Sequence, residues 1–102
     1  MQSEDRLKPM ELEFLRRLDE IREFDFVGFR AEPMPRGGIA ISRYGQLRGV
    51  WTEDDWVMFW QPSSAEAPVR HAATIDEALR QTMKIVLMSL KVRRLRSAGR
   101  AA

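Results

Sequence analysis

The residues that could support acid–base, nucleophilic or metal chemistry are few in this chain and are poorly spaced for it. His71 is the only histidine, and the chain has no cysteine. A zinc site or a nucleophile–base pair needs several such groups close together. The acidic run Glu53-Asp54-Asp55 lacks the spacing and the closing glutamate of a calcium-binding loop. We therefore expect no metal, no cofactor and no catalytic residue, and we predict that the protein is not an enzyme.

Tryptophan clustering points instead to an interaction surface. All three tryptophans fall between positions 51 and 60. Three exposed indoles would leave roughly 600 Å² of apolar surface in water, and burying that area is worth up to about 15 kcal/mol. We expect a helix, a second subunit or another protein to cover them, so that the face is either core or binding site. The predicted partner-binding residues are Trp51, Trp56, Met58 and Trp60, with Ile85, Met88 and Val92 from the C-terminal helix.

The charges suggest nucleic-acid binding as an alternative function. The net charge is only +2, but residues 77–102 hold seven basic residues and one acidic residue. Such a basic end can contact phosphates, and tryptophans can stack on unpaired bases. The residues predicted for this role are Lys91, Arg93, Arg94 and Arg96. The same charges would also stabilise the C-terminal end of a helix through its dipole.

Two helices are predicted, one at each end of the chain. Pro9 suits the first turn of a helix, and apolar residues recur at helical spacing from Met10 to Ile21, so this helix should end near Glu23. A capping box at Thr74 and Glu77 predicts a second helix from Ile75 to about Arg96. It carries two apolar stripes, one through Leu79, Met83, Val86 and Leu90, the other through Ile85, Met88, Val92 and Leu95. A helix with so wide an apolar surface usually contacts two neighbours.

Strands are predicted between the helices. Residues 24–29 read as an extended segment or loop, and residues 31–38, with two prolines and two glycines, as the main loop. Strands should span 39–43, 46–51 and 56–61, with a short fourth strand at 69–73. Tyr44-Gly45 forms the first turn and residues 52–55 the second.

These turn lengths set the pairing and sort the side chains into two apolar faces. The pairing places Ile39 opposite Val50 and Trp51 opposite Trp56. One face then holds Ile39, Ile41, Val50, Val57 and Phe59. The other holds Ala40, Leu47, Gly49, Trp51, Trp56, Met58 and Trp60.

The combined reading is an α+β fold with an N-terminal helix, an antiparallel three- to four-stranded β-meander and a C-terminal helix. We expect a flexible N-terminus at residues 1–8, a single domain over 9–96 and a flexible tail at 97–102. The chain has neither a long apolar stretch nor a signal-peptide pattern, so we predict a cytoplasmic protein that does not bind membranes. The predicted function is protein interaction, most simply as a homodimer.

Overall fold

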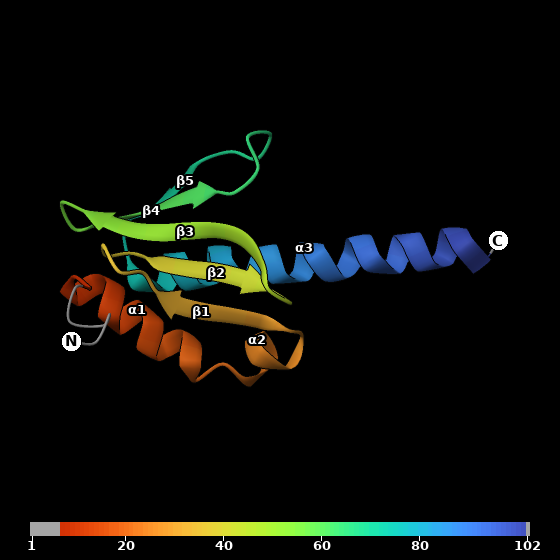
Figure 1. Cartoon of the computed structure of the whole chain (residues 1–102), viewed down its shortest axis with the longest axis horizontal. Helices are drawn as coiled ribbons and strands as arrows, with labels where there is room; N and C mark the ends of the chain where they lie inside the picture. Colours follow the sequence, from red (N-terminus) through yellow and green to blue (C-terminus); the bar gives the residue numbers. More distant parts are fainter. Residues whose placement is uncertain (1–6, 102) are drawn as a thin grey trace.

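The structure is a computed structural model that describes residues 7–101, with side chains as far as Met88. Within these residues, three helices and five strands follow one another (Figure 1). Their bounds are α1 Pro9–Asp19, α2 Arg22–Phe26, β1 Phe29–Pro33, β2 Ile39–Arg43, β3 Gln46–Asp54, β4 Val57–Pro62, β5 Arg70–Ala72 and α3 Ile75–Ala101. The expectation of a flexible N-terminus at residues 1–8 falls largely outside the described residues.

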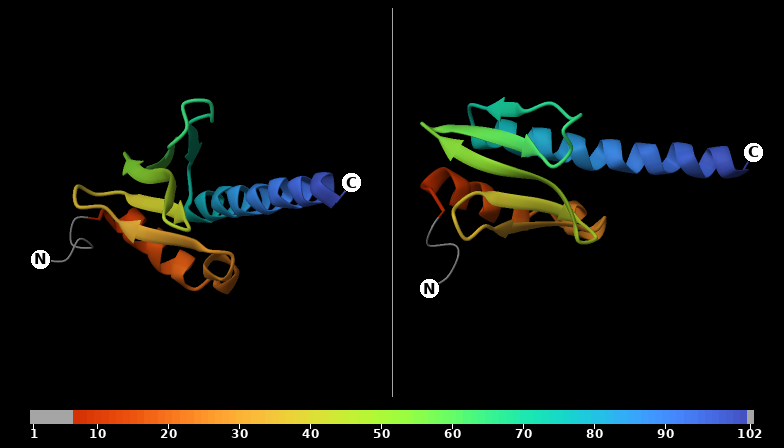
Figure 2. Two further views of the ribbon diagram at one scale, coloured as in Figure 1. Left: turned by 45° about the vertical axis from the view of Figure 1, so that its right-hand side comes forward. Right: turned by 45° about the horizontal axis from the view of Figure 1, so that its top comes forward.

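The five strands form one antiparallel sheet in chain order, β1-β2-β3-β4-β5. Helices α1 and α3 lie on the same side of this sheet and contact each other (Figures 1 and 2). The molecule is therefore two-layered, with one face of the sheet covered and the other open. The predicted α+β class is confirmed, with five strands where three or four were expected.

The N-terminal helix stops earlier than its apolar pattern predicted. Helix α1 ends at Asp19, Ile21 is extended with φ −91° and ψ 102°, and the short helix α2 follows. Helix α2 occupies the first part of the segment at 24–29 that was expected to be extended. The change of direction at Ile21 points Phe24 into the core, where its ring lies 5.5 Å from that of Phe29. The burial of Phe24 gives a tertiary reason for a break that no proline or glycine marks.

Helix α3 begins at the predicted cap. The backbone N–H of Glu77 donates to Oγ1 of Thr74 over 3.1 Å, while the Glu77 carboxylate accepts from the N–H of Ala73 rather than from that of Thr74. The helix continues to Ala101, beyond the expected end at Arg96. Its first half packs on the sheet, and its second half extends past the end of the sheet (Figure 1).

Strand β1 occupies part of the segment that was expected to be the main loop. The N–H of Met34 donates to the carbonyl of Gly38, and the N–H of Tyr44 donates to the carbonyl of Gly28. These bonds show that the backbone N–H and carbonyl groups of the even-numbered residues of β1 point toward β2. The nitrogen of Pro33 therefore points to the outer edge, where its missing N–H removes no bond within the sheet. A proline is compatible with an edge strand for this reason.

A β-bulge changes the predicted sorting of the faces. The turn at Tyr44-Gly45 is as predicted, with Arg43 opposite Gln46, but the register shifts by one residue at Arg48. Ile39 therefore pairs with Trp51 instead of Val50. Because side chains alternate along a strand, this shift moves Ile39 and Ile41 to the tryptophan face. The expected grouping of Ile39 and Ile41 with Val50 is wrong.

The second hairpin has a two-residue turn where four residues were expected. Asp54 pairs with Val57, and Asp55 and Trp56 form the turn with φ of 51° and 63°. Trp51 consequently pairs with Trp60 rather than with Trp56. The partner of Trp51 changes by an even number of residues, from 56 to 60. Because side chains alternate between faces along a strand, Trp51, Met58 and Trp60 still share one face. Trp56 moves to the tip of the hairpin.

Candidate functional site

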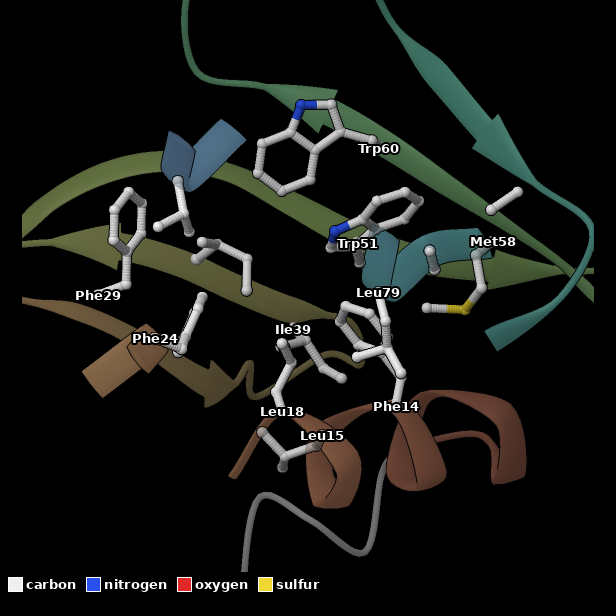
Figure 3. Packing of buried hydrophobic residues seen from close by; sticks show 14 residues of the cluster. Phe14, Leu15, Leu18, Phe24, Phe29, Ile39, Trp51, Met58, Trp60 and Leu79 are labelled. Carbon is white, nitrogen blue, oxygen red and sulfur yellow. The ribbon is translucent and has the colours of Figure 1, made fainter. Parts of the chain in front are cut away.

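The tryptophan face is the hydrophobic core. Trp51 and Met58 are completely buried, and Trp60 is 3% exposed. The Trp51 ring lies 5.4 Å from that of Trp60 and 5.7 Å from that of Phe14. Figure 3 shows both indoles on the side of the sheet from which Phe14 and Leu79 approach. These three predicted binding residues are thus covered by the helices of their own chain and are inaccessible to a partner in the folded state.

Helix α3 is tied to this core by a buried hydrogen bond. The indole N–H of Trp51 donates to Oγ1 of Thr82 over 3.0 Å, and this hydroxyl donates to the carbonyl of Ala78 over 2.8 Å. Thr82 is fully buried. Beside Trp60, a Cβ on Gly49 would lie 2.4 Å from the ring, so the absence of a side chain there lets the indole pack directly against the backbone of β3.

The charged groups at the start of α1 also have a structural role. Glu11 is 2% exposed, and its two carboxylate oxygens accept from the backbone N–H groups of Lys8 and Glu53, each over 2.9 Å. The Lys8 ammonium donates to the Glu53 carbonyl over 2.7 Å and lies 3.6 Å from the Glu53 carboxylate. These bonds fix the start of α1 against β3. Both oxygens of Glu11 are thus engaged within the fold.

Three of the other predicted contact residues lie on or near the surface, but they are not together. Trp56 is 67% exposed at the β3–β4 turn, and Met88 is 58% exposed on α3, beyond the last described buried residue, Val86. Ile85 is partly buried against the core, and the side chain of Val92 lies outside the described residues. Leu87, which belonged to neither predicted stripe, is 59% exposed beside Met88. Among the described side chains of α3, the exposed apolar residues are therefore Leu87 and Met88.

The predicted nucleic-acid contacts fall on the projecting part of α3. Its backbone is helical through Lys91, Arg93, Arg94 and Arg96, but their side chains lie outside the described residues. The buried indoles of Trp51 and Trp60 are not available for stacking on bases. Only Trp56 among the tryptophans is exposed.

The open face of the sheet mixes polar and apolar side chains. Pairing places Thr52, Phe59 and His71 in one row across β3, β4 and β5. Phe59 is 38% exposed and Leu47 48% exposed, while Val50 and Val57 are partly buried. His71 faces solvent among these residues and has no metal-ligating neighbours grouped with it within the described part of the chain.

A groove runs along the outer edge of β1. It has a volume of about 630 Å³ and lies between β1 on one side and the end of α1 with α2 on the other. Phe26 lines it and is 89% exposed, the highest exposure among the large apolar residues described. The sequence offered a signal in the aromatic run 24–29, but only an extended segment or loop was predicted there.

Comparison of the chain with models of known protein families, with curated proteins and with solved structures found no match. Among residues 7–101, no helix has both the length and the apolar character needed to cross a membrane.

Proposed function

We propose that this chain is a non-enzymatic protein-interaction domain that self-associates through the outer surface of α3. The observation that carries the proposal is the exposure of Leu87 and Met88 just beyond Val86, the last described residue that α3 buries. Large apolar side chains exposed on a helix are typical of a contact with another protein. A homodimer in the cytoplasm is the simplest form of this proposal, and the absence of cysteine fits a reducing compartment.

The length of α3 supports the same proposal. An isolated helix shorter than about 12–15 residues is only marginally stable in water, so most helices depend on packing. Val86 is the last described residue that α3 buries, and the helix continues to Ala101. In sequence, Met88, Val92 and Leu95 follow the four-and-three spacing of a coiled-coil seam, while Ile85, one turn earlier, packs on the core of its own chain. A second helix packed along this spacing would stabilise the projecting half.

Sedimentation equilibrium of the chain and of a Leu87→Gln/Met88→Gln variant tests the proposal. Glutamine keeps the helix propensity and approximate length of these side chains but removes their apolar surface. We expect the variant to associate at least about tenfold more weakly than the wild type. A matched control replaces Arg80 and Lys84, which are exposed on the packed half of α3, with glutamine. Equal association of wild type and variant would contradict the role of α3.

Nucleic-acid binding through Lys91, Arg93, Arg94 and Arg96 is the second candidate. It is supported by the position of these residues on the part of α3 that extends past the sheet. A gel-retardation assay with single-stranded and double-stranded nucleic acid would test it. Binding should weaken with rising salt and be lost when Arg93, Arg94 and Arg96 are replaced with glutamine. Retained binding in that variant would argue against this function.

A further inference from the structure

The groove between α2 and β1 exposes a large apolar side chain. Phe26 is 89% exposed and lines the groove together with the buried rings of Phe24 and Phe29. No described residue of α3 lines the groove, because α3 runs past the end of the sheet instead of along α2 (Figures 1 and 2). The helix that projects from a given copy therefore leaves the groove of that copy uncovered.

The surface around this groove is acidic. Residues 19–32 include every charged residue of the groove lining except none from α3, and they hold five acids and two bases, all of them exposed. Asp25 and Glu32 line the groove and form no ion pair within the described residues. An acidic surface around an exposed phenylalanine is complementary to a partner segment that is both basic and apolar.

The projecting half of α3 has that composition. After residue 77, α3 holds seven basic residues and no acidic residue. Two turns of it, residues 91–97, hold four of these bases together with Val92 and Leu95. Positions three apart lie on the same face of a helix, so Val92 and Leu95 share one face. The acidic groove and the basic helix are thus complementary parts of one chain.

The dimensions and the placement of the two parts also match. The groove follows residues 29–32 of β1, which span roughly 10 Å at about 3.3 Å per residue, and two turns of a helix span about 11 Å. Helix α2 lies at the end of the sheet past which α3 projects (Figure 1). Two copies that meet at this end can therefore each place α3 in the groove of the other.

We propose that the projecting half of α3 from a second copy lies in this groove, and that the exchange is reciprocal. Val92 and Leu95 pack on Phe26, and the neighbouring bases pair with Asp25 and Glu32, in the helix-in-groove mode of recognition. Each copy supplies one helix and one groove, so the two contacts are identical and the dimer is closed. The inference rests on the self-association through α3 proposed above and names the surface that receives the helix.

A substitution of Phe26 tests the apolar part of the contact. Phe26→Gln should weaken dimerisation about tenfold or more, because the exposed ring no longer contributes apolar surface to the contact. Trp56→Gln is the matched control. Trp56 is an aromatic residue of similar exposure, 67%, but it lies at the β3–β4 turn, at the other end of the sheet (Figure 1). This control should dimerise like the wild type.

Charge reversal tests the pairing of groove and helix. Asp25→Lys/Glu32→Lys makes the groove basic, and Arg93→Glu/Arg94→Glu makes the helix more acidic. Each variant alone should dimerise roughly ten- to a hundredfold more weakly than the wild type, because both of its contacts then oppose like charges. An equimolar mixture of the two variants should form the dimer again. In that mixed dimer the basic groove receives the acidic helix, and the other contact has wild-type charges.

Sedimentation equilibrium from micromolar to millimolar concentration gives the readout, with circular dichroism to show that each variant is folded. Unchanged dimerisation of Phe26→Gln, or a mixture of folded variants that stays monomeric, would overturn the inference. An average mass above that of a dimer would overturn the reciprocal exchange. If Leu87→Gln/Met88→Gln weakens association while the groove variants do not, the groove is not the receiving surface and the proposed function stands. A wild-type chain that stays monomeric would contradict both.

Discussion

Replacing Thr82 with valine removes the hydrogen-bond acceptor of the Trp51 indole without changing the shape of the side chain much. Trp51 is fully buried, so water cannot replace the lost acceptor in the folded protein. In the unfolded chain the same N–H bonds to water. A buried donor left without a partner costs about 1–3 kcal/mol.

The loss should appear directly in a urea titration followed by circular dichroism. With a urea dependence of about 1–3 kcal/mol per M for a small domain, the unfolding midpoint should fall by about 1 M. The hydroxyl also donates to the carbonyl of Ala78, but that bond contributes little because such back-bonding within a helix is weak. The expected change therefore belongs mainly to the indole.

A double-mutant cycle separates this bond from other effects of the valine. In a Trp51→Phe background no N–H remains to be satisfied, so Thr82→Val should be close to neutral or slightly stabilising. The coupling between the two positions should be about 1–2 kcal/mol. The hydrogen bond from Trp51 to Thr82 would be refuted as a stabilising contact if the Thr82→Val variant were as stable as the wild type. It would also be refuted if Thr82→Val lowered the stability equally in the wild-type and the Trp51→Phe backgrounds.

Two other substitutions test particular contacts. Glu11→Gln places an amide NH₂ against one of the two backbone N–H donors and should lower the free energy of unfolding, measured in urea, by about 1–3 kcal/mol. The exposed Glu13→Gln is the control and should leave the urea midpoint unchanged. Equal midpoints for the two variants would show that the buried carboxylate is not needed. Trp56→Gly relieves a left-handed backbone conformation with φ of 63° in an exposed turn and should raise stability by about 0.5–1 kcal/mol. A lower melting temperature for that variant would mean that the Trp56 side chain makes a stabilising contact.

The element types could be predicted from the sequence because their signals are local. The proline at the start of α1, the Thr74 cap of α3 and the Tyr44-Gly45 turn each act within a few residues. The strands of the central hairpins follow from the same kind of signal. These features required no knowledge of what packs against what.

The sorting of the sheet faces was not predictable in the same way. The bulge at Arg48 adds one residue to β3 and shifts the partners of residues 39–41 by one, which places Ile39 and Ile41 on the tryptophan face. Nothing in the local sequence marks it, since Gly49 fits a regular strand as well as a bulge. The burial of Ile39 and Ile41 beside Trp51 gives a tertiary reason for the shift, because it leaves polar residues to the open face.

The candidate surface was predicted only in part. Met88 was identified by helical spacing and is exposed, whereas Trp51, Met58 and Trp60 were identified by their apolar character and are core. Apolar residue type alone does not distinguish a core from an interface. Strand β1 was missed because Pro33 suggested a loop, although a proline is tolerated where its nitrogen faces away from the sheet.

The proposed self-association is tested most directly by sedimentation equilibrium of the wild-type chain across a wide concentration range. We predict an average mass that rises above the monomer as concentration increases and that falls at each concentration in the Leu87→Gln/Met88→Gln variant. A single monomer mass at every concentration would contradict self-association through α3.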